Sequence, residues 1–176
     1  METTGTTPET SSVSDRRTKD RAGFRLHPMA PEAVALARRT GVDVNGNTVQ
    51  YLTTNGGEPL RCCLRNARPG ERAMLFGYRP VIPASPYIET GAVFAHAEPC
   101  AGPVSTGSYP GDWFGRPQVL RAYDARGWIH PATRTHDGGD PEAAIMDVLA
   151  EPGVVQLHSR NVTYGCYMFT ATRSRD

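Results

Sequence analysis

The sequence lacks the features of membrane and secreted proteins. No stretch approaches the roughly 18 consecutive apolar residues that a membrane-spanning helix needs. The opening METTGTTPETSSVSDRRTKDRAG has no apolar core of the kind that secretory signals carry. Four cysteines in 176 residues are too few for a disulfide scaffold. We therefore expect a cytoplasmic protein with reduced thiols and no membrane partner.

A strong charge bias is also missing. The formal net charge is +1 with neutral histidines, and there is no block of acidic or basic residues of the kind that binds nucleic acid. Glycine-rich phosphate loops of the Walker or dinucleotide type are absent as well. The hydrophobic fraction of 39% is typical of a globular domain with a real core. These observations exclude a nucleic-acid partner and favour a small-molecule ligand.

The composition divides the chain into a tail and a domain. Residues 1–22 are rich in Thr, Ser and Glu and then in Arg and Lys, and Val13 and Ala22 are almost the only apolar side chains after the start. Such a segment cannot bury enough surface to offset its ordering entropy, so we predict a disordered N-terminal tail, with docking to a partner as the alternative. We predict that residues 23–176 form a single α+β domain.

Two segments, 29–41 and 140–153, carry helix signals. Pro31 suits a first helical turn and Gly41 ends the first helix. Asp140 can cap the second helix, in which Ile145, Val148 and Leu149 form an apolar stripe.

Strand-like runs separated by Gly, Pro, Asn and Asp make up most of the remainder. They cover residues 59–67, 72–80, 91–99, 118–125, 127–130, 154–162 and 165–173. Because strands and helices do not alternate, we expect an α+β fold with a curled, mainly antiparallel sheet and two short helices. Residues 98–117 and 130–140 are predicted to be loops, the longer one a functional lid or disordered.

Side chains alternate between the two faces of a strand, which lets the candidate site residues be sorted. One pocket could collect six of them: Cys63, His96, Arg121, Tyr123, His158 and Cys166. A thiol beside an imidazole is the arrangement that makes a cysteine nucleophilic. We predict His158 as general acid/base, Cys63 or Cys166 as nucleophile, and Asn161 as the residue that orients the imidazole.

The remaining predicted roles concern binding. Arg121 would hold an anionic group of the substrate, with Tyr123 and Tyr167 beside it, or would instead form an internal ion pair with Glu71, Glu89 or Asp124. Each cysteine could equally be a small apolar core residue, and each histidine could serve only as a hydrogen-bond partner.

A metal site is a weaker alternative on sequence grounds. His96, His158, Cys63 and Cys166 offer the nitrogen and sulfur atoms that zinc prefers. However, no Cys-x2-Cys or His-x-His spacing anchors them, and Cys62 and Cys63 would diverge if they were neighbours on a strand. We therefore expect neither a metal nor another cofactor.

Four blocks in this order resemble the bacterial family catalogued as domain of unknown function 1203 (DUF1203). They are PLRCCLRNARPGE, SPYIETGAVFAHAEPC, QVLRAYDARG and VVQLHSRNVTYGCYMF, and the resemblance covers about residues 23–172. Ala92 and Val162 depart from the family pattern without affecting the fold. The resemblance implies a compact, stand-alone bacterial protein, as found in many actinobacteria. It implies no activity, but its motif positions include His96, Arg121, His158, Asn161 and Cys166.

Three functions are compatible with these residues. The first is a small cofactor-free enzyme that acts on a small polar or acyl-type metabolite, in a specialised biosynthetic pathway, by His/Cys acid-base or nucleophilic chemistry. The second is a non-catalytic small-molecule-binding or assembly protein, and the third is a zinc-binding protein. Exposed strand edges favour a homodimer.

Overall fold

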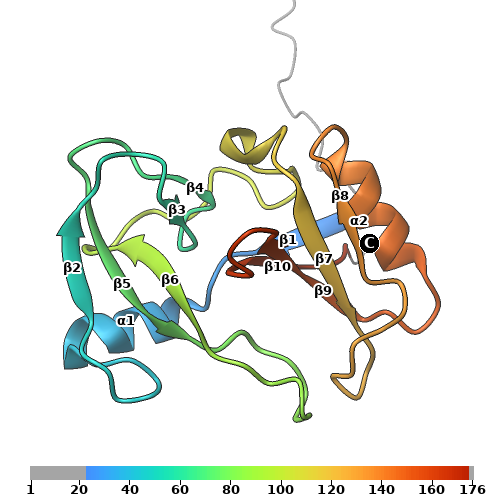
Figure 1. The fold of residues 1–176 in the computed structure, drawn as a ribbon, viewed down its shortest axis with the longest axis horizontal. Coiled ribbons are helices and arrows are strands. Elements are labelled where there is room, and N and C mark those ends of the chain that lie inside the picture. The colour runs from blue at the N-terminus through green and yellow to red at the C-terminus, as the bar shows by residue number, and fades with distance from the viewer. Residues whose placement is uncertain (1–22, 175–176) are drawn as a thin grey trace, which may run out of the picture.

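The computed structural model describes residues 23–174, so the predicted tail over residues 1–22 lies outside the described residues. Two five-stranded sheets lie side by side, each accompanied by one helix (Figure 1). The elements in chain order are β1 (Phe24–His27), α1 (Pro31–Thr40), β2 (Gln50–Thr53), β3 (Pro59–Leu60), β4 (Arg65–Asn66), β5 (Arg72–Tyr78), β6 (Gly91–His96), the short 3-10 helix η1 (Gly111–Trp113), β7 (Gln118–Tyr123), β8 (Arg134–His136), α2 (Pro141–Ala150), β9 (Gln156–Asn161) and β10 (Tyr167–Arg173).

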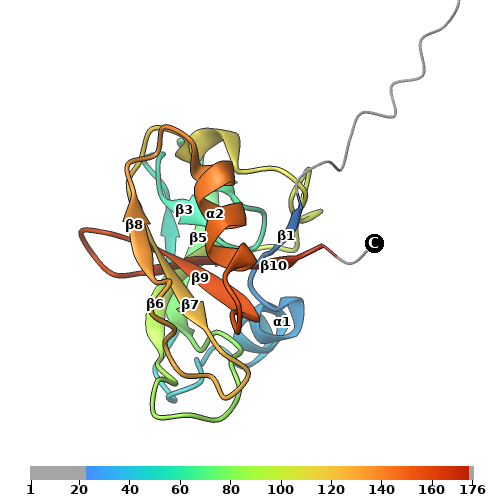
Figure 2. The same ribbon diagram turned by 90° about the vertical axis from the view of Figure 1, so that its right-hand side faces the viewer.

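One sheet has the order β1-β10-β9-β7-β8, and all its pairings are antiparallel. Helix α2 lies on the outer side of this sheet, away from the other one (Figure 2). The Asp140 side chain accepts a hydrogen bond from the Ala143 backbone at the start of α2, which satisfies an otherwise unpaired N–H group. The apolar stripe Ile145, Val148 and Leu149 is buried against the strands.

The other sheet has the order β2-β5-β6-β3-β4, with β3 parallel to β6 and the other pairings antiparallel. Helix α1 buries Val34 and Ala37 against the side chains of β5 and β6. It ends at Gly41, whose φ of 69° closes the helix in the left-handed conformation that glycine adopts without strain.

Buried polar contacts join the two sheets. Arg61, 3% exposed, follows β3 and donates from Nε to the carbonyl of Tyr167 in β10 at 2.8 Å. Trp113, fully buried, donates from Nε1 to Oδ1 of Asn66 in β4 at 2.9 Å and stacks on Phe169 in β10. Residues far apart in sequence are thereby held together at the junction.

The predicted fold class is confirmed, since the structure is α+β with mainly antiparallel strands and two helices. Both helices lie where the sequence predicts them. The predicted strand 59–67 is wrong: it is a hairpin of two very short strands around a turn at residues 61–64. The predicted strand 127–130 makes only an isolated bridge, through Ile129.

Three strands were not predicted. They are β1, β2 and β8, and β8 lies inside the predicted loop 130–140. Across residues 23–174, neither helix is long and apolar enough to span a bilayer.

Candidate metal centre

Two adjacent cysteines lie on the turn that joins β3 to β4. The turn closes because Leu64 adopts a φ of 54°, in the left-handed region, and because the Cys63 backbone donates to the carbonyl of Leu60 at 3.4 Å. The Arg61 backbone donates to Phe94 of β6 at 3.0 Å, which fixes the turn beside that strand. Side chains on a turn do not alternate as they do on a strand, so Cys62 and Cys63 both reach His96.

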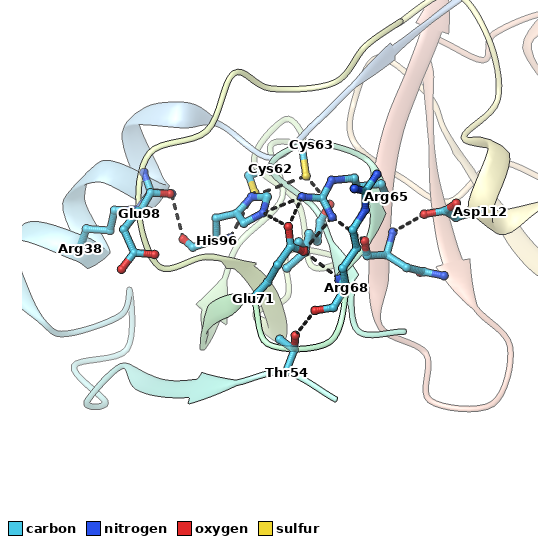
Figure 3. Close-up of polar contacts among 12 residues, drawn as sticks. Arg38, Thr54, Cys62, Cys63, Arg65, Arg68, Glu71, His96, Glu98 and Asp112 are labelled. Atoms are coloured by element: carbon cyan, nitrogen blue, oxygen red, sulfur yellow. Dashed lines mark hydrogen bonds and ion pairs between the residues drawn. The ribbon is translucent and has the colours of Figure 1, made fainter. Parts of the chain in front are cut away.

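His96 is the last residue of β6, and Cys100 follows four residues later in the next loop. The imidazole Nδ1 lies 3.5 Å from the Cys62 sulfur and 3.7 Å from the Cys63 sulfur (Figure 3). One ligand atom from each of four residues lies within 4.8 Å of all the others; we call these residues, Cys62, Cys63, His96 and Cys100, the thiol–imidazole cluster. All three cysteines are free of disulfides.

The Arg65 guanidinium determines the tautomer of a neutral His96 ring. Arg65 Nη2 lies 3.0 Å from Nε2 of His96, and a guanidinium can only donate hydrogen bonds. Nε2 therefore accepts, and the proton of the neutral ring lies on Nδ1, directed at the sulfur atoms. In this state Nδ1 donates to a thiolate and cannot accept a proton from a thiol.

Several donors stabilise negative charge on sulfur. The Cys63 thiol donates to Cys62, and the backbone N–H of His96 donates to the same sulfur at 3.3 Å. These hydrogen bonds lower the pKa of Cys62 to about 5, despite the opposing effect of burial. The backbone N–H of Gly102 donates to Cys100. The other two sulfur atoms behave in the opposite way: the hydrogen bond to Cys62 raises the pKa of Cys63, and burial raises the pKa of Cys100. The cluster thus holds one thiolate, on Cys62, and a metal would have to displace the protons of the other two thiols.

A second layer of side chains surrounds the cluster. Arg65 binds Glu71 with both ends of its guanidinium, at 2.8 and 2.7 Å, and this pairing lowers the pKa of Glu71 to about 2. Glu71 Oε1 lies 3.8 Å from Nε2 of His96. A fixed carboxylate therefore faces the side of the imidazole that points away from the sulfur atoms (Figure 3).

Arg38 of α1 positions the segment that carries two of the cluster residues. Its guanidinium donates to the backbone carbonyls of His96, Ala97 and Glu98 at 2.9, 3.0 and 2.8 Å. The segment from His96 to Glu98 is thus attached to the helix as well as to the sheet (Figure 3).

Two cavities adjoin the cluster. One, of about 760 Å³, is lined by Cys63, Arg65 and Arg68 together with the loop after β6. The other, of about 440 Å³, is lined by Cys62, Cys100 and Arg38. Volumes of this size are typical of small-molecule sites.

The structure divides the predicted site residues into separate groups. Cys63 and His96 do come together, as predicted. His158 lies in the other sheet, where its ring packs between Tyr123 and Tyr167 at centroid distances of 4.7 and 5.4 Å. His158 is 1% exposed, so it is closed off from solvent and lies apart from Cys63 and His96.

The remaining predicted residues have structural partners. Arg121 pairs with Glu89 at 3.0 Å, which is one of the ion pairs named as alternatives. Asn161 accepts from the Tyr164 backbone in the turn after β9 rather than orienting the His158 ring. Cys166 donates to the carbonyl of Tyr164 and lines a different cavity from Cys63.

Cys62 and Cys100 were missed by the sequence analysis. Cys62 was discounted because residues 59–67 were taken for a strand, on which neighbouring side chains diverge. The available signal was His96 followed by Cys100 four residues later, a spacing that two ligands of one ion can have. No metal was expected because Cys-x2-Cys and His-x-His spacings are absent and because Cys62 and Cys63 would diverge on a strand. On the observed turn both cysteines approach His96, so the second reason no longer holds.

Comparison with known proteins gives one match. A family model described as "Protein of unknown function (DUF1203)" matches residues 57–173, which include all four residues of the thiol–imidazole cluster. No curated protein and no solved structure matches the chain.

Proposed function

Because the chain belongs to the DUF1203 family, whose description names no activity, we propose a function from geometry: the protein binds a zinc ion through the thiol–imidazole cluster. The observation that carries this proposal is the convergence of three sulfur atoms and one imidazole nitrogen within 4.8 Å. Cys3His is a ligand set that structural zinc sites use.

The distances fit tetrahedral coordination. Zinc bonds of about 2.3 Å to sulfur and about 2.0 Å to nitrogen separate a sulfur and a nitrogen ligand by about 3.5 Å. The separations of 3.5 and 3.7 Å between Nδ1 and the sulfur atoms of Cys62 and Cys63 match this edge of the tetrahedron. The ion would need only small movements of its ligands.

The surrounding groups suit a metal. Three thiolates and Zn²⁺ leave a charge of −1, which Arg65 and Arg38 offset because they interact electrostatically with the cysteines. When Nδ1 binds the ion, the remaining ring proton lies on Nε2, where Arg65 Nη2 lies at 3.0 Å, so the Arg65 guanidinium has to turn aside before Nε2 can donate to Glu71, whose Oε1 is 3.8 Å away. Zinc-bound histidines usually donate to such a carboxylate.

The decisive experiment is zinc analysis of the full chain purified under reducing conditions. We expect one zinc per chain, and after replacement by cobalt the visible absorption of a tetrahedral cobalt–thiolate centre. Cys100→Ser and His96→Ala should lose the metal, whereas Cys166→Ser, a cysteine outside the cluster, should keep it. Binding of less than a tenth of an equivalent by the wild-type chain when zinc is supplied would refute the proposal.

A second candidate is the small cofactor-free enzyme, with a cysteine of the cluster as nucleophile. It is favoured by the contacts of Cys62 and Cys63 with His96, next to the cavity of about 760 Å³. The lowered pKa of Cys62 also favours it, because a thiolate is already the nucleophile and needs no base. Alkylation of the metal-free protein discriminates: one fast-reacting cysteine in a chain that does not bind zinc would support the enzyme.

Further proposals concern the cellular location, the partners and the source of the protein. Reduced thiols are needed for zinc binding, and this supports a cytoplasmic location. Binding of a small molecule, homodimer formation, an actinobacterial source and a role in specialised biosynthesis stay predictions, as does the assignment of residues 23–176 to one domain.

A further inference from the structure

A second polar site lies away from the thiol–imidazole cluster. A cavity of about 200 Å³ is lined by Glu89, Arg160, Tyr164, Cys166 and Tyr167, together with residues 90–92. None of these residues belongs to the cluster, so the two sites can be tested independently.

Arg160 of β9 is the buried cation of this site. Its side chain is 7% exposed. Nη1 donates to the carbonyl of Gly165 at 3.1 Å, and Nη2 pairs with Glu89. Nε is buried and has no partner among the described residues. A guanidinium has five N–H groups, so Arg160 retains donors that are not used.

The site carries more positive than negative charge. Glu89 also pairs with Arg121, so one carboxylate serves two guanidinium groups. Buried charges are normally balanced by opposite charge, and here the balance is incomplete within the described residues.

Glu89 differs from the arginine that it binds. Its side chain is 41% exposed, and residues 79–90 around it form neither helix nor strand. The carboxylate can therefore leave at lower cost than the buried Arg160 can. Glu89 thus has the character of an internal ligand that an external anion can replace.

We propose that this cavity binds a small oxyanion, the carboxylate or phosphate of a small molecule, with Arg160 as its principal partner and Glu89 as the competing internal carboxylate. The volume of about 200 Å³ accommodates a single charged group rather than a large ligand. Arginine suits this role because its planar fork of donors matches carboxylate and phosphate oxygens.

Cys166 provides a built-in probe because its side chain lines the cavity. The experiment compares alkylation of Cys166 by anionic iodoacetate and by neutral iodoacetamide in the folded full chain, read by peptide mass spectrometry. Alkylation of Cys166 by iodoacetate should slow in a saturable way when inorganic phosphate is added at constant ionic strength. Added acetate should slow it in the same way. Chloride at the same ionic strength should not.

Variants identify the groups responsible. Glu89→Gln should tighten the protection by phosphate about two- to fivefold, the range expected for removal of a half-exposed ion-pair partner. Arg160→Met should abolish the protection, whereas Arg126→Met, at a 73% exposed arginine of another ion pair, should leave it unchanged.

Two results would overturn the proposal. One is the absence of saturable protection by phosphate and acetate in both the wild-type chain and Glu89→Gln. The other is equal protection in a folded Arg160→Met. Should Arg160→Met fail to fold, as judged by circular dichroism, the comparison of wild type with Glu89→Gln still decides the question.

Discussion

Acid should destabilise this protein through one buried imidazole. His158 is 1% exposed, and it lies between the rings of Tyr123 and Tyr167. Its Nδ1 has no hydrogen-bond partner among the described residues. Burial and then the nearby guanidinium groups of Arg160 and Arg121 lower the pKa of His158 to about 3.

The sign and size of the effect follow from proton linkage. The unfolded chain takes up a proton on this ring near pH 6.5, whereas the folded chain does so only near pH 3. Stability is therefore fully present above pH 6.5 and falls as the pH is lowered towards 3, by up to about 1.4 kcal/mol per pH unit. Between pH 7.5 and 5 the loss attributable to His158 is about 2 kcal/mol.

The assay is urea unfolding of the wild-type chain and His158→Phe at several pH values from 7.5 to 5. Phenylalanine keeps an aromatic ring between the two tyrosines but cannot titrate. All other groups titrate in both proteins, so the difference in unfolding free energy isolates the histidine. We expect the advantage of the wild type to shrink, or its deficit to grow, by about 2 kcal/mol over this range.

A difference that stays constant within about 0.5 kcal/mol from pH 7.5 to 5 would refute the reasoning. His158 would then have an ordinary pKa despite its burial. In that case the ring could exchange protons near neutral pH, and the predicted role of His158 as general acid/base would regain support.

Three further predictions test the packing around the two sheets. Arg38→Met should speed the loss of zinc to a chelator about tenfold, because Arg38 holds the segment that carries His96, whereas Arg39→Met, at an exposed neighbour, should not. Trp113→Phe should lower the unfolding free energy by about 1–3 kcal/mol, since it removes a hydrogen bond and leaves a cavity in the fully buried site; an unchanged urea midpoint would contradict this. Gly138→Ala should lower the unfolding free energy by about 2 kcal/mol more than Gly46→Ala. Both glycines have positive φ, but only at Gly138 would a Cβ lie 2.4 Å from backbone. Equal unfolding free energies of the two variants would contradict this.

Local sequence determined both helices and most of the long strands. Asp140 and Gly41 act within a few residues of their own position, so the ends of the helices could be predicted from the chain alone. Side chains of β6 alternate as strand geometry requires, with Val93 and Ala95 buried and His96 on the other face. The family resemblance is confirmed as well. It rests on four short blocks of sequence in a fixed order, and such blocks can be recognised without knowing the fold.

Only the tertiary structure decided which side chains meet. A positive φ at Leu64 turns a predicted strand into a hairpin, and that change brings Cys62 and Cys63 to one imidazole. Cys100 joins them through a loop whose path depends on contacts with α1, about sixty residues earlier in the chain. His158 was separated from Cys63 because β9 and β3 belong to different sheets. Strand pairing and turn closure depend on contacts between distant residues, and periodicity along a single chain carries no information about them.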